Sequence, residues 1–165
     1  MSGSKNFGVL EKNHLQTIVF YKHNYSDTYY KEDAPYDFHY LINSSSNYTG
    51  LNLSYGFTSK FTIETDWGYY LNKIQNYYFN NYRLVGHGLS DLSLLLKYNF
   101  FNSKDSVIGF TVTGGTKFPT GAYREYTKDK VKLPRDVQSG TGAYSVIAGL
   151  NVKMKAFKKI TFIVN

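Results

Sequence analysis

The stretch "YTGLNLSYGFTSKFTIETDWGYYL", residues 48–71, alternates apolar side chains with small or polar ones on both sides of the short link TSK. Leu51 and Leu53 fall on one face of an extended chain, and Asn52 falls on the other. A period of two residues is typical of a strand with one apolar and one polar face. The two halves of this stretch are therefore predicted to pair as a β-hairpin, and each is about as long as a tilted membrane-spanning strand.

The same alternation extends along most of the chain. It recurs at 89–101, 107–115, 143–154 and 160–164, and more weakly at 15–22. The 17 Tyr, 12 Phe and 14 Gly of the sequence favour pleated strands joined by tight turns. With 165 residues, the chain is long enough for one domain with a sizeable core. The sequence therefore predicts a single all-β domain over residues 1–165.

Links of two lengths join these segments. The links at 58–60, 102–105 and 155–158 are short, and those near 24–47, 72–88 and 117–142 are long. Short and long links alternate, which is typical of an antiparallel up-and-down meander with turns on one rim and loops on the other. The three long links are predicted to be the outer loops.

The charged residues of the alternating segments share the polar face. A transmembrane β-barrel turns its apolar face to lipid and encloses a polar lumen, whereas a soluble barrel does the reverse. Charges among small polar residues suit a hydrated lumen, so the meander is predicted to be part of a transmembrane β-barrel. An open pore and an interior filled by paired charges remain alternatives. The predicted lumen-facing residues are Glu64, Asp66, Asp91, Lys97, Lys117 and Lys153.

Aromatic residues mark both ends of the apolar face. Phe57 and Phe61 lie next to a short turn, and Tyr69 and Tyr144 lie near the long loops. Aromatic side chains at both interfaces are typical of membrane barrels. No apolar run reaches the roughly 18 residues of a spanning helix. The predicted partner of the apolar face is therefore the lipid bilayer.

A soluble alternative fits the same alternation. In a lipocalin-like ligand-binding barrel or a surface adhesin, the apolar face would be a dry interior. Leu51, Ile63, Leu94 and Val146 would then form the core. The direction in which these four side chains point separates the two hypotheses.

Three motifs in the second half of the chain carry a family resemblance. They are "GLSDLSLLLKYNFF" at 88–101, "GGTKFPTG" at 114–121 and "LPRDVQSGTGAYSVIAGL" at 133–150. In order and spacing they resemble a signature of Gram-negative outer-membrane β-barrel transporters, similar to the phenol meta-pathway outer-membrane proteins. The matching residues are Gly88, Asp91, Lys117, Pro119, Thr120, Gly121, Gln138, Gly140, Thr141 and Gly142.

The resemblance covers about residues 85–150. It implies an outer-membrane barrel with a role in passive transport or binding of small solutes, hydrophobic ones included, and it brings no catalytic residues. Lys117 would face the lumen near the rim, and Pro119 with Gly121 would end a strand.

The residues give little support to an enzyme or a metal site. The chain has no Cys, which excludes disulfides, cysteine-ligated zinc and a cysteine nucleophile. The histidines, His14, His23, His39 and His87, carry no short-spaced ligand set, and only His87 is near a candidate nucleophile, Ser90. We therefore expect no catalytic residue, no metal and no cofactor.

The net charge of +7 is spread along the chain. The densest basic cluster, "KDKVKLPR" at 128–135, lies in a predicted loop and contains an Asp. Dispersed charge of this kind is not the footprint of a nucleic-acid-binding surface. No nucleic-acid partner is expected.

The number of segments predicts that this is the N-terminal portion of a longer barrel. Single-chain bacterial barrels have an even number of strands, and seven segments are found here. The last one, "TFIVN", stops inside a strand, which leaves backbone groups unpaired. Further strands are expected beyond Asn165, and an export signal ahead of Met1.

Overall fold

The computed structural model describes residues 8–36, 40–79, 82–103, 108–127, 130–156 and 160–164, with the backbone alone from residue 155 onward. The described part is all-β, as predicted, and contains no helix that could cross a membrane. The strands are β1 (Leu15–Ser26), β2 (Tyr30–Lys31), β3 (Ala34–Pro35), β4 (Leu41–Gly56), β5 (Phe61–Tyr77), β6 (Arg83–Leu89), β7 (Leu92–Asn102), β8 (Ile108–Phe118), β9 (Ser145–Ala156) and β10 (Ile160–Val164).

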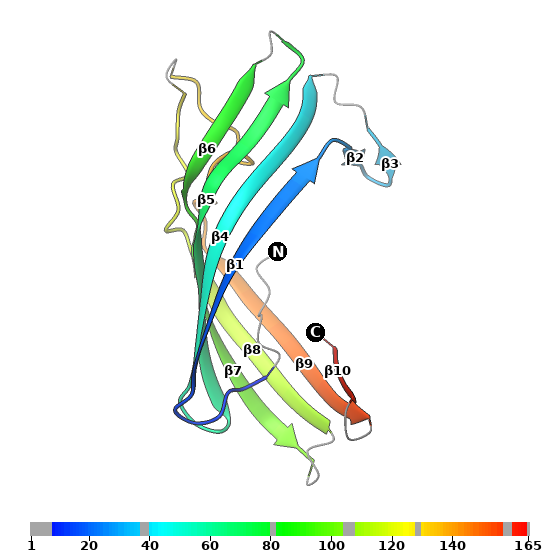
Figure 1. Cartoon of the computed structure of the whole chain (residues 1–165), viewed down its shortest axis with the longest axis vertical. Coiled ribbons are helices and arrows are strands. Elements are labelled where there is room, and N and C mark those ends of the chain that lie inside the picture. The colour runs from blue at the N-terminus through cyan, green and yellow to red at the C-terminus, as the bar shows by residue number, and fades with distance from the viewer. Residues whose placement is uncertain are drawn as a thin grey trace.

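Eight of these strands form one antiparallel sheet within the described residues. The order is β1-β4-β5-β7-β8-β9-β10, and β6 pairs with β5 beside this path. Figure 1 shows that the sheet is twisted and curved and does not close. The up-and-down meander predicted from the alternating links is confirmed. The remaining two strands, β2 and β3, pair in the link between β1 and β4.

One long strand, β5, pairs along the same edge with two shorter strands, one after the other. Its first half pairs with β7 and its second half with β6. The backbone N–H of Ser90, between β6 and β7, donates to the carbonyl of Gly68 at 2.8 Å. This hydrogen bond continues the ladder across the interruption, so β6 and β7 follow a single path along β5.

The predicted hairpin at 48–71 is present, since β4 and β5 pair from Gly56 with Thr62 onward. The long loop predicted at 72–88 is wrong. The strand β5 continues to Tyr77 and β6 begins at Arg83, which leaves a link of residues 78–82. The loop predicted at 24–47 is also shorter, because β1 runs to Ser26 and β4 starts at Leu41.

A β-bulge explains why the second half of β5 escaped the sequence pattern. Tyr48 pairs with Tyr70 and the preceding Asn47 pairs with Asn72, so Leu71 is an extra residue in β5. An extra residue reverses which positions face each side of a sheet. Both Tyr70 and Lys73 therefore face inward. The inward positions are even-numbered before Leu71 and odd-numbered after it, so a search for a period of two residues fails here.

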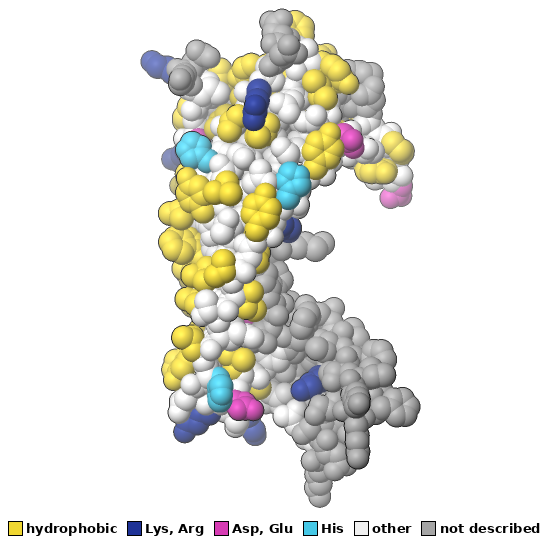
Figure 2. Space-filling model, viewed as in Figure 1, with side chains coloured by type: hydrophobic (Ala, Val, Ile, Leu, Met, Phe, Trp, Pro, Cys, Tyr) yellow, Lys and Arg dark blue, Asp and Glu magenta, His cyan; other side chains and the backbone are white. Residues whose placement is uncertain are grey.

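The two faces of the sheet have opposite polarity. Along β7, Ser93, Lys97 and Asn99 are buried, while Leu96 and Tyr98 between them are exposed. The strands β4, β5, β8 and β9 likewise bury polar residues on the inner side and expose apolar ones on the outer side. Figure 2 shows hydrophobic side chains spread over the outer surface to which β1 and β4 contribute. The inner, polar side is thus covered and the outer, apolar side is open.

The apolar outer surface is a band of limited height. On β4 it runs from the turn next to Phe57 to Thr49, about 26 Å along the strand and about 20 Å after correction for a typical tilt. Beyond Thr49 the outward residue is Asn47, whose amide donates to the Oδ1 of Asn72 at 2.9 Å. The outer face therefore changes from apolar to polar at this level.

Aromatic rings meet at both ends of the band. Near the short turns, the rings of Phe61 and Tyr98 stack with centroids 4.5 Å apart. Near the long β8–β9 loop, the rings of Phe118 and Tyr144 meet edge to face at 6.0 Å. Aromatic pairs in these geometries stabilise neighbouring strands beyond the area that they bury.

Candidate functional site

A buried ion pair occupies the middle of the inner face. Glu64 on β5 and Lys97 on β7 come from neighbouring strands, and Lys97 Nζ lies 2.6 Å from Glu64 Oε2. Both side chains are 0 % exposed. Ser54 on β4 lies close by, with its Oγ 3.3 Å from the same carboxylate oxygen. Isolated charges are costly in such a place, and pairing offsets this cost.

A second carboxylate, Asp91, holds both ends of the β8–β9 loop, residues 119–144. Its Oδ1 accepts from the N–H of Gly121 at 3.1 Å, near the start of the loop. Its Oδ2 accepts from the N–H of Thr141 at 3.0 Å and from the Thr141 hydroxyl at 2.6 Å, near the end of the loop. Lys117 Nζ lies 3.4 Å from the same oxygen. Asp91 itself sits between β6 and β7, so one side chain joins three parts of the chain.

The glycines of the three motifs allow these parts to approach. A Cβ on Gly140 would lie 2.4 Å from the backbone of Gly121, so neither position has room for a side chain. Gly88 has a φ of 137°, and a Cβ there would also meet the Ser139 hydroxyl. The motifs that were separate in the sequence therefore pack against one another around Asp91.

The β8–β9 loop folds back onto the inner face of the sheet. Val137 is completely buried and packs with Leu84 of β6, Leu133 and Tyr77. Lys73 of β5 donates from Nζ to the carbonyl of Gln138 at 2.7 Å. The loop predicted at 117–142 is thus long, as expected, but it is a folded element that covers the interior.

A second segment, residues 8–13, covers the inner face near the β4–β5 turn. The N–H of Leu10 donates to Thr62 Oγ1 at 2.7 Å, and the N–H of Asn13 donates to the carbonyl of Gly56 at 2.7 Å. A Cβ on Gly56 would overlap the carbonyl of Glu11. Sequence reasoning missed this contact because the segment has no alternation, and only the small residue at position 56 hinted at a close approach.

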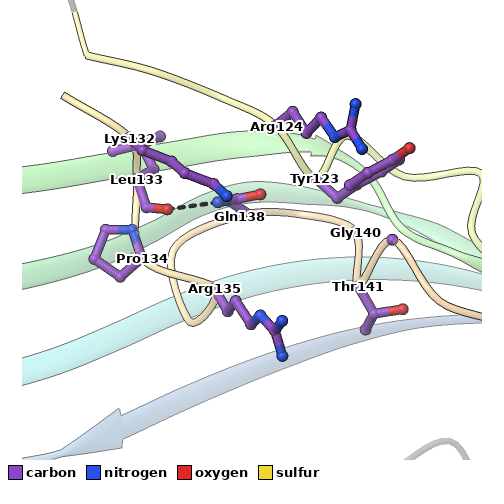
Figure 3. Close-up of a pocket in the computed structure, with 10 residues that line it drawn as sticks. Tyr123, Arg124, Lys132, Leu133, Pro134, Arg135, Gln138, Gly140 and Thr141 are labelled. Atoms are coloured by element: carbon purple, nitrogen blue, oxygen red, sulfur yellow. Dashed lines mark hydrogen bonds between the residues drawn. The ribbon is translucent and has the colours of Figure 1, made fainter. Parts of the chain in front are cut away.

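A pocket of about 410 Å³ lies within the folded β8–β9 loop. Figure 3 shows its lining, with Gln138 reaching across to the carbonyl of Leu133. Three basic side chains, Arg124, Lys132 and Arg135, surround it. The sequence places this basic cluster in a loop and gives no sign of the pocket, because the pocket walls come from residues up to 19 positions apart in the chain.

The six predicted lumen-facing residues lie at different depths. Glu64, Asp91 and Lys97 are buried on the inner face, and Lys117 is partly exposed beside Asp91. The structure thus brings four of the six into two pairs. Asp66 is half-buried one step beyond Glu64 on β5, and Lys153 is exposed on β9, on the same side as the buried Asn151.

The described histidines do not form a catalytic arrangement. His87 is exposed on β6, whereas Ser90 is buried, with its hydroxyl 3.3 Å from that of Tyr48. His14 is exposed, and His23 points outward to Asn47. His39 lies outside the described residues. Among those that are described, no group of three or more acidic or histidine side chains could hold a metal ion.

Two comparisons with known proteins find no relative. A scan against protein-family models finds no match, and a search of curated proteins finds none either. What the protein does must therefore be inferred from the placement of its side chains.

Proposed function

We propose that this chain forms part of the wall of an outer-membrane β-barrel that binds or passes a small solute. The observation that carries the proposal is the polarity of the sheet. Lys97 and Glu64 are 0 % exposed on the inner side, while Leu96 is 52 % and Val146 is 87 % exposed on the outer side. A surface of this kind is unfavourable in water and favourable against hydrocarbon.

The dimensions of the apolar band support a lipid partner. Its height of about 20 Å approaches the roughly 25 Å apolar band of outer-membrane barrels. Aromatic residues such as Phe57 and Phe61 at one end, and Tyr144 at the other, lie where aromatic girdles meet the headgroups. An antiparallel sheet satisfies backbone groups between strands, as hydrocarbon requires.

The outward direction of four side chains favours lipid over the soluble alternative. A lipocalin-like barrel needs Leu51, Ile63, Leu94 and Val146 in a dry interior. All four lie on the side of the sheet opposite the buried Asn52, Glu64 and Ser93. That direction suits a membrane barrel, whose lipid side is apolar.

The inner face supports a role with polar or charged groups in contact with solute. It carries the Glu64–Lys97 and Asp91–Lys117 pairs, and it is covered by residues 8–13 and by the β8–β9 loop. Movement of a solute along this face would depend on those two covers. The resemblance to outer-membrane transporters of Gram-negative bacteria agrees with such a role, and no catalytic step is proposed.

The single Trp of the chain offers a direct test. Trp67 points outward on β5 within the apolar band and is 41 % exposed. In vesicles whose lipids carry bromine on their acyl chains, we expect strong quenching of its fluorescence. A variant with Trp67→Phe and His23→Trp places the reporter outward on β1 but above the band, and we expect much weaker quenching there.

Two results would contradict the proposal. One is a folded whole chain that stays monomeric in water without detergent and does not bind vesicles. The other is equal quenching of the reporters at positions 67 and 23, since only a depth-dependent lipid contact separates them.

A further inference from the structure

The pocket in the β8–β9 loop is built before any ligand arrives. The N–H of Gly140 donates to the carbonyl of Ala122 at 2.8 Å, and the N–H of Leu133 donates to that of Glu125 at 2.9 Å. Gln138 Nε2 donates to the carbonyl of Leu133 at 2.5 Å, the bond drawn in Figure 3. These contacts fix the arms of the loop around the pocket. A site that is already ordered loses little conformational entropy on binding.

One aromatic wall of the pocket is also fixed. Gly142 has a φ of 69°, and a Cβ there would lie 2.4 Å from the ring of Tyr123. The ring therefore packs directly against the backbone of the returning arm. The guanidinium of Arg124 lies over the same ring, 5.4 Å from its centroid. This contact positions one cation at the edge of the pocket.

No described carboxylate lies within ion-pair distance of the basic residues that line the pocket. Ten residues line it, and none of them is Asp or Glu. Arg124, Lys132 and Arg135 form no ion pair with any described carboxylate. Figure 3 shows Arg124 on one arm of the loop and Lys132 with Arg135 on the other. Positive charge around a pocket whose lining contains no carboxylate is the electrostatic setting of an anion site.

We propose that this pocket binds a small organic di- or tricarboxylate. Guanidinium groups pair with carboxylates through two parallel hydrogen bonds, and three cations on the two arms of the loop can engage more than one carboxylate. Leu133 and Pro134 supply apolar contact for a short carbon skeleton. The volume of about 410 Å³ lies within the usual range of small-molecule sites.

A soluble ligand suits the location better than a lipid headgroup does. The loop packs on the inner face of β5 and β6 through Val137 and Lys73, away from the apolar outer surface. If the proposed barrel function holds, this site would select anions at the mouth of the lumen. Only this selection role, and not anion binding, rests on the proposed function. Anion binding requires only the folded β8–β9 loop, so it can be tested independently of the barrel function.

The test is a calorimetric titration of citrate into the whole chain in detergent micelles at low ionic strength. We expect saturable binding with one site. Arg124→Gln and Arg135→Gln should each weaken it about tenfold, the loss expected for one charge-assisted pair. Arg83→Gln is the matched control, since Arg83 is exposed at the start of β6 and does not line the pocket.

Three other outcomes would overturn the assignment of the pocket to a di- or tricarboxylate. Absence of saturable heat would remove the site, and an equal loss in Arg83→Gln would reduce binding to general attraction. Displacement of citrate by an equal concentration of inorganic phosphate would replace the carboxylate class by compact anions. Brominated-lipid quenching of Trp67, measured on the same variants, shows separately whether the proposed membrane function has failed.

Discussion

At the scale of single residues, the buried Glu64–Lys97 pair is the most sensitive point of the inner face. Lys97 Nζ and Glu64 Oε2 lie 2.6 Å apart and neither side chain is exposed. The attraction between the two charges therefore offsets part of the cost of removing each from water. Removing one partner of a buried pair is far more damaging than replacing both by apolar residues of similar volume. This asymmetry gives the pair a distinctive mutational signature.

Lys97→Met is expected to lower the free energy of unfolding by about 3–5 kcal/mol, because it removes the cation that lies 2.6 Å from a buried carboxylate. Adding Glu64→Leu to Lys97→Met should restore most of the loss. Urea unfolding of the vesicle-inserted protein, followed by Trp67 fluorescence, measures both effects. Lys60→Met in the exposed β4–β5 turn is the control and should leave the midpoint unchanged. A double variant less stable than Lys97→Met would contradict this account.

Alternation along the chain predicts the face on which a residue lies but not its partner. Glu64 and Lys97 both follow from the period of two. Their meeting depends on the register in which Thr62 pairs with Lys97, a match between strands 35 positions apart. Likewise, Asp91 and Thr141 belong to separate motifs, and no local pattern predicts that one binds the other.

At the scale of elements, the β8–β9 loop depends on Asp91. This carboxylate accepts three hydrogen bonds from Gly121 and Thr141 at the two ends of the loop. Bonds to a charged acceptor are stronger than neutral ones. The loop is therefore held as a unit, and its opening should be controlled from a position outside it.

Asp91→Ala is expected to open the loop and to speed tryptic cleavage after Arg124, Lys132 and Arg135 by at least about tenfold, since each lost charge-assisted bond contributes roughly 1.5–3 kcal/mol. Mass spectrometry of a digestion time course measures the rate at each site. Asp33→Ala, in the exposed turn between β2 and β3, removes the same charge and should cleave at the original rate. Identical rates in the two variants would show that the loop is held by other contacts.

The element pattern was predictable where alternation is uninterrupted. The β4–β5 hairpin and the segments that became β7 to β10 follow from it directly. The upper part of β5 and all of β6 do not, because the extra residue Leu71 shifts the phase and two of the outward positions beyond it in β5, Asn72 and Asn76, are amides. Such a stretch has polar residues on both faces and looks like a loop.

At the scale of the whole molecule, the apolar band dictates where a charge can be placed on the outside. Leu53 lies at the middle of the band on β4, and His23 lies outward on β1 above it. A charge facing hydrocarbon costs most at the midplane and little near the interface. The outer surface should therefore respond to substitution according to height.

Leu53→Lys is expected to destabilise the vesicle-inserted protein by about 2–4 kcal/mol, the cost of a lysine at the bilayer midplane. His23→Lys should have little effect. Urea titrations of both variants in the same lipid provide the comparison. Equal midpoints would argue against a lipid-facing band.

The strand β4 extends well beyond the apolar band at one end only. Beyond Asn47, β4 continues to Leu41, about 20 Å farther, and its outward side chains include Asn43, which bonds to Asn76 of β5. At the opposite end the turn follows Phe57 at once. A bilayer on the band would leave a tall hydrated collar on one side and an almost flush surface on the other. If the proposed outer-membrane location holds with the collar outward, antibodies and phage would contact mainly the collar, and the periplasmic side would present little more than the turns.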